Sequence, residues 1–312
     1  MSTVAALAVI FRDNILPLLI LMGLGYLLQR RTGLEMKTLS RLNMHIFVPA
    51  LAIHALSRAE LPLEGLLRVV AYVALLQSSL FVVGRAWGYV RGYSVGMSAA
   101  FTCALIFYNS GNYGYPLIAL LYGEDSPAVG FQAIVLAMQN LTTFSIGQVI
   151  IRGPQLGVRR ALIEYFKMPF PYALGLGLVL QQTDWSLPTP LARTVEILAG
   201  GLVPLALVTL GAQLALVRWD RRVGAVLAAC VLRLVVAPLL GLLLLLLFGW
   251  RGLLAQQLLI SAAVPTAVNT AILAIEFENE PDFAAQAVML STLASAGSVT
   301  IFIYLAQRLF PT

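Results

Sequence analysis

The sequence has little charge, only two cysteines and only two histidines. Just 11% of its 312 residues are Asp, Glu, Lys or Arg, whereas soluble globular domains carry about one quarter. Both cysteines, Cys103 and Cys230, lie in apolar runs with no other Cys or His at ligand spacing, which argues against a disulfide or a metal site. The N-terminus also lacks the basic, apolar and small-residue order of a removable signal peptide.

These shortages exclude several classes of protein. An intramembrane enzyme should show clustered His, Asp, Glu or Ser–Lys groups, and the sequence contains no such cluster, so we expect no enzyme, no catalytic residue and no cofactor. No stretch is polar enough to form a separate soluble signalling domain. The net charge of +6 is better explained as a membrane-topology signal than as a nucleic-acid footprint, so we expect no nucleic-acid partner.

Hydrophobic residues make up 60% of the chain, which predicts an all-α integral membrane protein. The apolar segments that could cross a bilayer cover residues 14–30, 40–57, 66–86, 95–122, 127–151, 168–183, 194–217, 223–248, 252–275 and 283–307, numbered here as the first to tenth spans. The longest loop, 152–167, is predicted to form an interfacial amphipathic link.

The distribution of positive charge predicts the orientation. Most of the 20 Lys and Arg residues follow the odd-numbered spans, and cytoplasmic loops are enriched in these residues. We therefore expect a multi-pass protein of the cell (inner) membrane, surrounded by lipid, with both termini extracytoplasmic.

The chain contains an internal repeat. GLGYLLQ at 23–29 recurs as GLGLVLQ at 175–181, Val48-Pro49 as Val203-Pro204, and QAIVL at 132–136 as QAVML at 286–290. Each half, 1–155 and 156–312, holds five predicted spans. Because five is odd, the second half must enter the membrane upside down, giving an inverted 5+5 repeat of the kind found in secondary transporters.

The fourth and ninth spans are interrupted by polar and helix-breaking residues. Residues 109–116 (NSGNYGYP) and 261–270 (SAAVPTAVNT) place Asn, Gly, Pro and Thr in the middle of the fourth and ninth spans, which occupy corresponding places in the two halves. Interrupted membrane helices are tolerated where they line a cavity, and paired interruptions point to a transport site. The alternative is a pair of Pro-kinked structural helices.

The chemistry of such a site follows from the helix ends. We expect the second halves to begin near Pro116 and Ala267, with their N-termini aimed at the bilayer centre, where free N–H groups favour a carboxylate. Pro116 and Pro265 are predicted to keep the helices broken. The predicted substrate-binding residues of the two breaks are Asn109, Gly111, Asn112, Tyr113, Gly114, Thr266, Asn269 and Thr270.

Other polar residues deep in spans leave alternatives open. Arg233 is the one basic residue deep within a span, and it either contacts the substrate or ties span-end carbonyls together. Gln77, Gln139 and Asn140 either line an ion or substrate path or hold helices together. Packed or interfacial roles are favoured over proton transfer for the two histidines, His45 and His54.

At these residues the chain resembles the auxin efflux carrier family. The family's break motif, Asn-x-Gly-Asn-x-Gly-x-Pro, is filled by Asn109, Gly111, Asn112, Gly114 and Pro116, whereas VPTAVNTA in the ninth span is less distinctive. The resemblance implies the fold of sodium–proton antiporters and bile-acid symporters, with two broken, crossing helices. It also implies a scaffold of spans 1, 2, 6 and 7, a mobile domain of spans 3–5 and 8–10, an elevator mechanism, and a homodimer that moves organic anions such as auxin-like acids or dicarboxylates.

The sequence therefore predicts a secondary transporter of a small organic anion, bound where the fourth and ninth spans cross. A Na⁺-coupled bile-acid-type symporter that uses Gln139 and Asn140 is one alternative, and a non-transporting membrane sensor is another. Coupling to H⁺, to Na⁺ or to the membrane potential is left open by the sequence.

Overall fold

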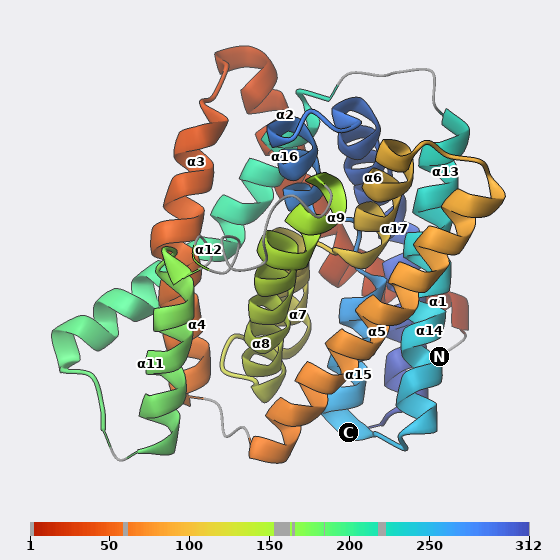
Figure 1. Cartoon of the computed structure of the whole chain (residues 1–312). Coiled ribbons are helices and arrows are strands. Elements are labelled where there is room, and N and C mark those ends of the chain that lie inside the picture. Colours follow the sequence, from red (N-terminus) through yellow and green to blue (C-terminus); the bar gives the residue numbers. More distant parts are fainter. Residues whose placement is uncertain are drawn as a thin grey trace.

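The computed structural model of the chain describes residues 3–58, 62–152, 163, 166–183, 185–217 and 223–311. Within these ranges the protein is helical and contains no strand, apart from one isolated antiparallel bridge (Figure 1). Seven helical runs are long and apolar enough to cross a membrane. They are α1–η1–α2 (Thr3–Ile10, Phe11–Ile15, Leu16–Thr32), α3–η2–α4 (Met36–Leu42, Asn43–Phe47, Val48–Arg58), α5 (Leu63–Val90), α8–η4–α9 (Pro127–Thr142, Thr143–Gly147, Gln148–Arg152), α12 (Thr189–Leu214), α13–η5–α14 (Val223–Val231, Leu232–Val236, Ala237–Leu247) and α17 (Pro281–Leu309), where η marks a π-helical turn.

The remaining helices are shorter. They are α6 (Val95–Ile106), η3 (Ser110–Gly114), α7 (Tyr115–Tyr122), α11 (Phe170–Gln182), α15 (Gly252–Ala263) and α16 (Val268–Glu276). Helices thus occupy all ten apolar segments identified in the sequence. Arg159, Arg160 and Glu164 of the predicted amphipathic link lie outside the described residues, as do Arg218 and the arginines at 221 and 222 that entered the orientation argument.

Proline accounts for most of the π-helical turns among the described residues. Pro17, Pro49, Pro116 and Pro238 each follow the last residue of such a turn by two positions. Proline has no N–H and its ring clashes with the carbonyl four residues back, and a π turn relieves the clash by widening the helix. The positions of proline in the sequence therefore account for most of these π-helical turns.

Glycines hold two pairs of helices unusually close. A Cβ on Gly25 of α2 would overlap the carbonyl oxygen of Val208 in α12, and one on Gly211 of α12 would overlap that of Met22. In the same way, Gly177 of α11 lies against the backbone of α4, and Figure 1 shows α4 and α11 side by side. Small residues allow such close approach of membrane helices, where dispersion contacts replace the hydrophobic effect.

Substitution of Gly211 tests this packing. Gly211→Leu should force α2 and α12 apart and lower the free energy of unfolding by about 1–3 kcal/mol or more, as over-packing does. Gly200→Leu on the same helix is the control, because no atom lies within 4 Å of its Cβ position. Thermal melting in detergent, followed by size-exclusion chromatography, should show a loss for Gly211→Leu only. Equal melting temperatures would contradict the packing argument.

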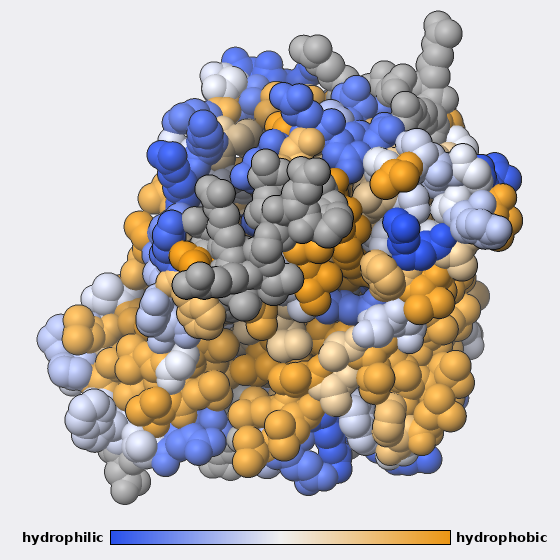
Figure 2. Space-filling model, viewed as in Figure 1, coloured by the Kyte–Doolittle hydropathy of each residue, from blue (hydrophilic) through white to orange (hydrophobic). Residues whose placement is uncertain are grey.

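The surface of the molecule is that of a membrane protein. Figure 2 shows apolar side chains across the middle and lower part of the visible face, with hydrophilic residues gathered at the top and the bottom. Large apolar side chains such as Leu67, Val82 and Ile197 are mostly exposed, as lipid-facing residues are. Together with the seven candidate spans, this identifies a multi-pass membrane protein.

Candidate functional site

The two interrupted helices meet at their breaks. α6 ends at Ile106 and α15 ends at Ala263, and each is followed by a short non-helical segment, 107–109 and 264–267. The segments run antiparallel and are joined by two backbone hydrogen bonds, from the N–H of Asn109 to the oxygen of Pro265 (2.8 Å) and from the N–H of Ala267 to the oxygen of Phe107 (2.9 Å). The breaks therefore form one unit.

The first break lies further upstream than the sequence predicted. The second half of the fourth span was predicted to begin near Pro116, and α7 does begin at Tyr115. A π-helical turn, η3, precedes it, however, so the helical path already restarts at Ser110. The cause is a cap: the side-chain oxygen of Asn109 accepts the N–H of Asn112 at 3.1 Å. In the ninth span, Pro265 lies within the break and α16 begins directly after Ala267, as predicted.

Arg233 binds the helix ends on the other side of the breaks. Its side chain is fully buried and donates to the carbonyl oxygens of Leu105 (2.9 Å), Val264 (3.2 Å) and Ala262. Its guanidinium carbon also lies 4.9 Å from the centre of the Tyr108 ring. The C-terminal carbonyls of a helix need such donors, and a cation there also matches the helix dipole. This is the structural tie that the sequence left as one of two alternatives.

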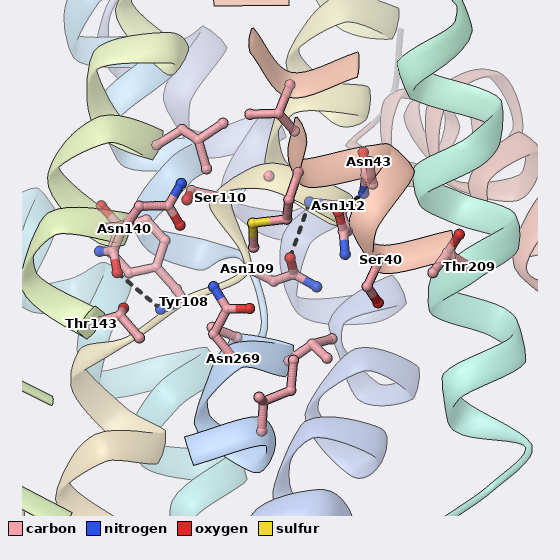
Figure 3. A pocket seen from close by; sticks show the side chains of 18 of the residues that line it. Ser40, Asn43, Tyr108, Asn109, Ser110, Asn112, Asn140, Thr143, Thr209 and Asn269 are labelled. Carbon is pink, nitrogen blue, oxygen red and sulfur yellow. Dashed lines mark hydrogen bonds between the residues drawn. The ribbon is translucent and has the colours of Figure 1, made fainter. Parts of the chain in front are cut away.

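A small cavity of about 60 Å³ lies against the breaks (Figure 3). It is lined by Ser40, Asn43, Met44, Val48, Tyr108, Asn109, Ser110, Gly111, Asn112, Leu136, Gln139, Asn140, Thr143, Thr209, Gln213, Ala267, Val268, Asn269 and Ile272. The lining is rich in amides and hydroxyls and contains no charged side chain among the described residues. Asn109, Gly111, Asn112 and Asn269 were predicted from the sequence to belong to the site. Gln139 and Asn140, for which the sequence left two roles open, line it too.

The other predicted site residues do not line this cavity but support the breaks. The hydroxyl of Thr266 donates to the oxygen of Ala104 (2.9 Å), that of Thr270 to Ala267 (2.7 Å), and Tyr113 Oη accepts from Ser295 (3.0 Å). The remaining three also lie outside the cavity lining. Gln77 donates to Thr142 at 2.8 Å, Gly114 packs against Gln132, and Arg233 donates to the backbone carbonyls at the ends of α6 and α15.

Two buried glutamines connect the helices around the site by hydrogen bonds. The sequence analysis did not assign them to the site. Gln132 of α8 donates from Nε2 to the oxygen of Ser110 at 2.8 Å, at the first turn of η3. Its own oxygen accepts from Nε2 of Gln257 in α15 at 2.7 Å and from the hydroxyl of Ser261. The network joins α8 to both interrupted helices, so it fixes where the breaks lie relative to the cavity.

Two amide nitrogens in the cavity wall have no partner among the described residues. The oxygen of Gln139 accepts the backbone N–H of Tyr108 at 3.4 Å, and the oxygen of Asn109 accepts that of Asn112. Because a backbone N–H can only donate, each contact leaves the side-chain nitrogen as the free group. Both nitrogens are buried and unpaired. The N-terminus of α16, which has no side-chain cap, opens on the same cavity through Val268 and Asn269.

This arrangement is suited to an anion. Unpaired amide N–H groups and an uncapped helix N-terminus are all hydrogen-bond donors, and leaving buried donors unpaired costs free energy. A carboxylate would satisfy them without any charged side chain.

A larger cavity of about 720 Å³ adjoins the small one. The two share Ser40, Met44, Gln213, Val268, Asn269 and Ile272. Lys37, Arg41 and His45 lie on one wall of the larger cavity and Asp282 on another. The larger cavity therefore leads from the breaks toward the loops that carry positive charge.

The sequence analysis missed the residues that α3, η2 and α12 bring to the small cavity, namely Ser40, Asn43, Thr209 and Gln213. The available signal was their polarity inside otherwise apolar spans. The two histidines lie elsewhere: His45 Nδ1 donates to the Arg41 carbonyl oxygen (3.1 Å), and Nε2 of buried His54 lies 3.9 Å from Asp125 Oδ1. Within the described part of the chain no cluster of His, Cys, Asp and Glu is suited to a metal ion.

The sequence matches one protein-family model and is similar to known proteins. Residues 10–160 and 156–303 match the family model described as "Membrane transport protein". A protein of Methanothermobacter thermautotrophicus named "Uncharacterized transporter" is 28% identical over 298 residues, covering 93% of this chain and 96% of its own length. A protein of Rhizobium meliloti named "Putative malonate transporter" is 27% identical over 316 residues, covering 94% of this chain and 95% of its own.

Proposed function

The chain belongs to the membrane transport protein family, and from this premise we propose that it is a secondary transporter of a small organic carboxylate, bound in the cavity between the two breaks. The observation that supports the carboxylate most directly is the pair of unpaired amide nitrogens of Asn109 and Gln139 beside the N-terminus of α16. The oxygen of Gln139, one of the groups that the Na⁺-coupled alternative would use, already accepts the N–H of Tyr108.

The volume of the cavity limits the size of the carboxylate that it can hold. A volume of about 60 Å³ holds about four to six water-sized groups, at about 10–15 Å³ each. Carboxylates of three or four carbons fit this volume better than auxin-like acids, which carry a fused ring. One relative is named for malonate, so malonate is the first ligand to test.

Alternating access is proposed to follow the elevator scheme on an inverted repeat of ten spans, with the halves at 1–155 and 156–312. Gly25 and Gly177, which correspond in the repeat, make swapped contacts: α2 packs on α12, and α11 packs on α4. This supports a scaffold of the first, second, sixth and seventh spans, with the other spans forming the mobile domain.

Several further features are proposed from the sequence and the family resemblance. The larger cavity leads toward Lys37 and Arg41, on the side predicted to be cytoplasmic, so this conformation would be open to the cytoplasm. The termini would then be extracytoplasmic, in the cell membrane. A homodimer, coupling to an ion gradient or to the membrane potential, and the absence of catalysis remain predictions.

Asn112→Ala tests the proposed function. It removes one amide from the cavity wall and also the acceptor that holds the amide of Asn43, so two lining groups are lost together. We expect malonate binding to be abolished while the protein stays folded. Binding by calorimetry on the purified chain and counterflow in liposomes are the measurements. Asn14→Ala is the matched control, because among the described residues the side chain of Asn14 bonds only to the Ile10 carbonyl in the first span. Undiminished affinity in Asn112→Ala, or no counterflow of any carboxylate by the wild type, would contradict the proposal.

A further inference from the structure

The wall of the small cavity formed by η2 and α12 differs from the rest. Figure 3 shows Ser40, Asn43 and Thr209 on one side of the cavity, with Asn140 and Thr143 of α8 and η4 on the opposite side. Gln213, one turn after Thr209 on α12, lines the same cavity. The two walls offer the ligand different chemistry.

Three oxygens on the first wall have no hydrogen-bond partner among the described residues: Asn43 Oδ1, Thr209 Oγ1 and Gln213 Oε1. Asn43 uses its nitrogen to donate to Asn112 Oδ1 at 2.8 Å, which leaves its oxygen as the remaining group. Thr209 and Asn43 are only 1% and 4% exposed, so bulk water does not compensate them. Leaving buried polar atoms unpaired costs free energy that a ligand could recover.

Thr209 is unusual for a threonine inside a helix. Thr102, Thr142 and Thr292 each donate their hydroxyl to the carbonyl four residues earlier, at 2.7 Å, as helical threonines commonly do. Thr209 makes no such bond, although it lies in the middle of α12. Its hydroxyl is therefore free to bond a group in the cavity that it lines.

We propose that the transported carboxylate carries a hydrogen-bond donor at the end remote from its carboxylate, and that Thr209 and Gln213 determine specificity by receiving it. The carboxylate would lie at the amide nitrogens of Asn109 and Gln139 and the donor at the oxygens on α12. Hydroxy acids and half-protonated dicarboxylates have this chemistry. A dianion is disfavoured, because no charged side chain in the described lining is available to compensate a second buried charge.

The inference rests on the proposed function. A matched pair of ligands tests it separately from carboxylate binding itself. Propionate has the carboxylate alone, whereas 3-hydroxypropionate adds a terminal hydroxyl. One added hydrogen bond in a closed site is worth about tenfold in affinity, so the full-length wild type should bind 3-hydroxypropionate about tenfold more tightly than propionate in calorimetry.

The variant for this test is Thr209→Val combined with Gln213→Met, which removes the polar atoms at nearly constant volume. Since these atoms are unpaired in the described structure, their removal should not unfold the protein. The ratio of the two affinities should fall to about one, through a loss of 3-hydroxypropionate affinity. Thr194→Val on the same helix should keep the full ratio, because within the described ranges the Thr194 hydroxyl bonds only to the Pro190 carbonyl.

The outcomes separate clearly. Equal binding of both acids by the wild type, or a preference that survives in the double variant, overturns the inference while leaving carboxylate transport intact. A parallel loss of both affinities in the double variant would show a merely structural role and overturns it too. If the wild type binds neither these acids nor malonate, the proposed function itself fails.

Discussion

Arg233→Leu should leave little folded protein. The substitution removes the donor from three buried carbonyls, those of Leu105, Ala262 and Val264, and each buried carbonyl left unpaired costs about 1–3 kcal/mol. The sum is a large share of a typical unfolding free energy of about 5–15 kcal/mol. Because Arg233 ties the end of α6 to the end of α15, its loss should separate the two breaks.

Melting temperature and the monodisperse fraction in detergent measure this effect. Arg233→Lys should be intermediate, since one ammonium group cannot reproduce the planar fork that reaches three oxygens. Arg68→Leu is the control: Arg68 is partly exposed and pairs with Glu64 on α5, and such surface pairs contribute little. A well-folded Arg233→Leu variant that no longer binds malonate would instead favour substrate contact, the other role that the sequence allowed.

The interruptions could be predicted from the sequence because their causes are local. Proline and glycine disfavour a continuous helix wherever they stand, so 109–116 and 261–270 were identified without a structure. Where a helix restarts was harder to predict. The sequence analysis named Pro116, but the cap at Asn109 starts a π-helical turn at Ser110, and Pro116 is tolerated in the turns that follow.

The role of Arg233 could not be derived in the same way. Its depth in the eighth span showed that it needs a partner, but Leu105 is 128 residues away in the chain and Ala262 is 29. A backbone carbonyl leaves no trace in residue type, so sequence patterns do not reveal that it is the acceptor. Substrate contact and a structural tie were therefore both compatible with the sequence.

The wall formed by Thr209 and Gln213 escaped prediction for a related reason. Which face of α12 meets the cavity is decided by how the helix is rotated against α2, and that depends on the close contacts at Gly25 and Gly211. An isolated Thr and Gln in an apolar helix are also common as bonds between helices. Only the three-dimensional arrangement shows that their oxygens are unpaired.

Asn109→Asp should abolish carboxylate binding while keeping the helix cap. Asp caps a helix N-terminus as well as Asn does, so the contact with the N–H of Asn112 is retained, and the negative charge suits the helix dipole. The unpaired nitrogen, however, is replaced by a charged oxygen that faces the ligand. Two like charges about 4 Å apart repel by about 4 kcal/mol at an effective dielectric constant of about 20, which corresponds to about a thousandfold in affinity.

Asn109→Ala provides the contrast that makes this result decisive. It removes the cap and the donor together, so we expect a loss of about 1 kcal/mol in stability and a weaker but measurable affinity for malonate. The two variants should therefore differ in binding: Asp, which places a negative charge beside the ligand, should bind malonate less than Ala does. Calorimetry and thermal melting at neutral pH measure both quantities. Malonate binding retained by Asn109→Asp would mean that no anion occupies the cavity at this residue, because only a neutral or cationic group tolerates the added charge.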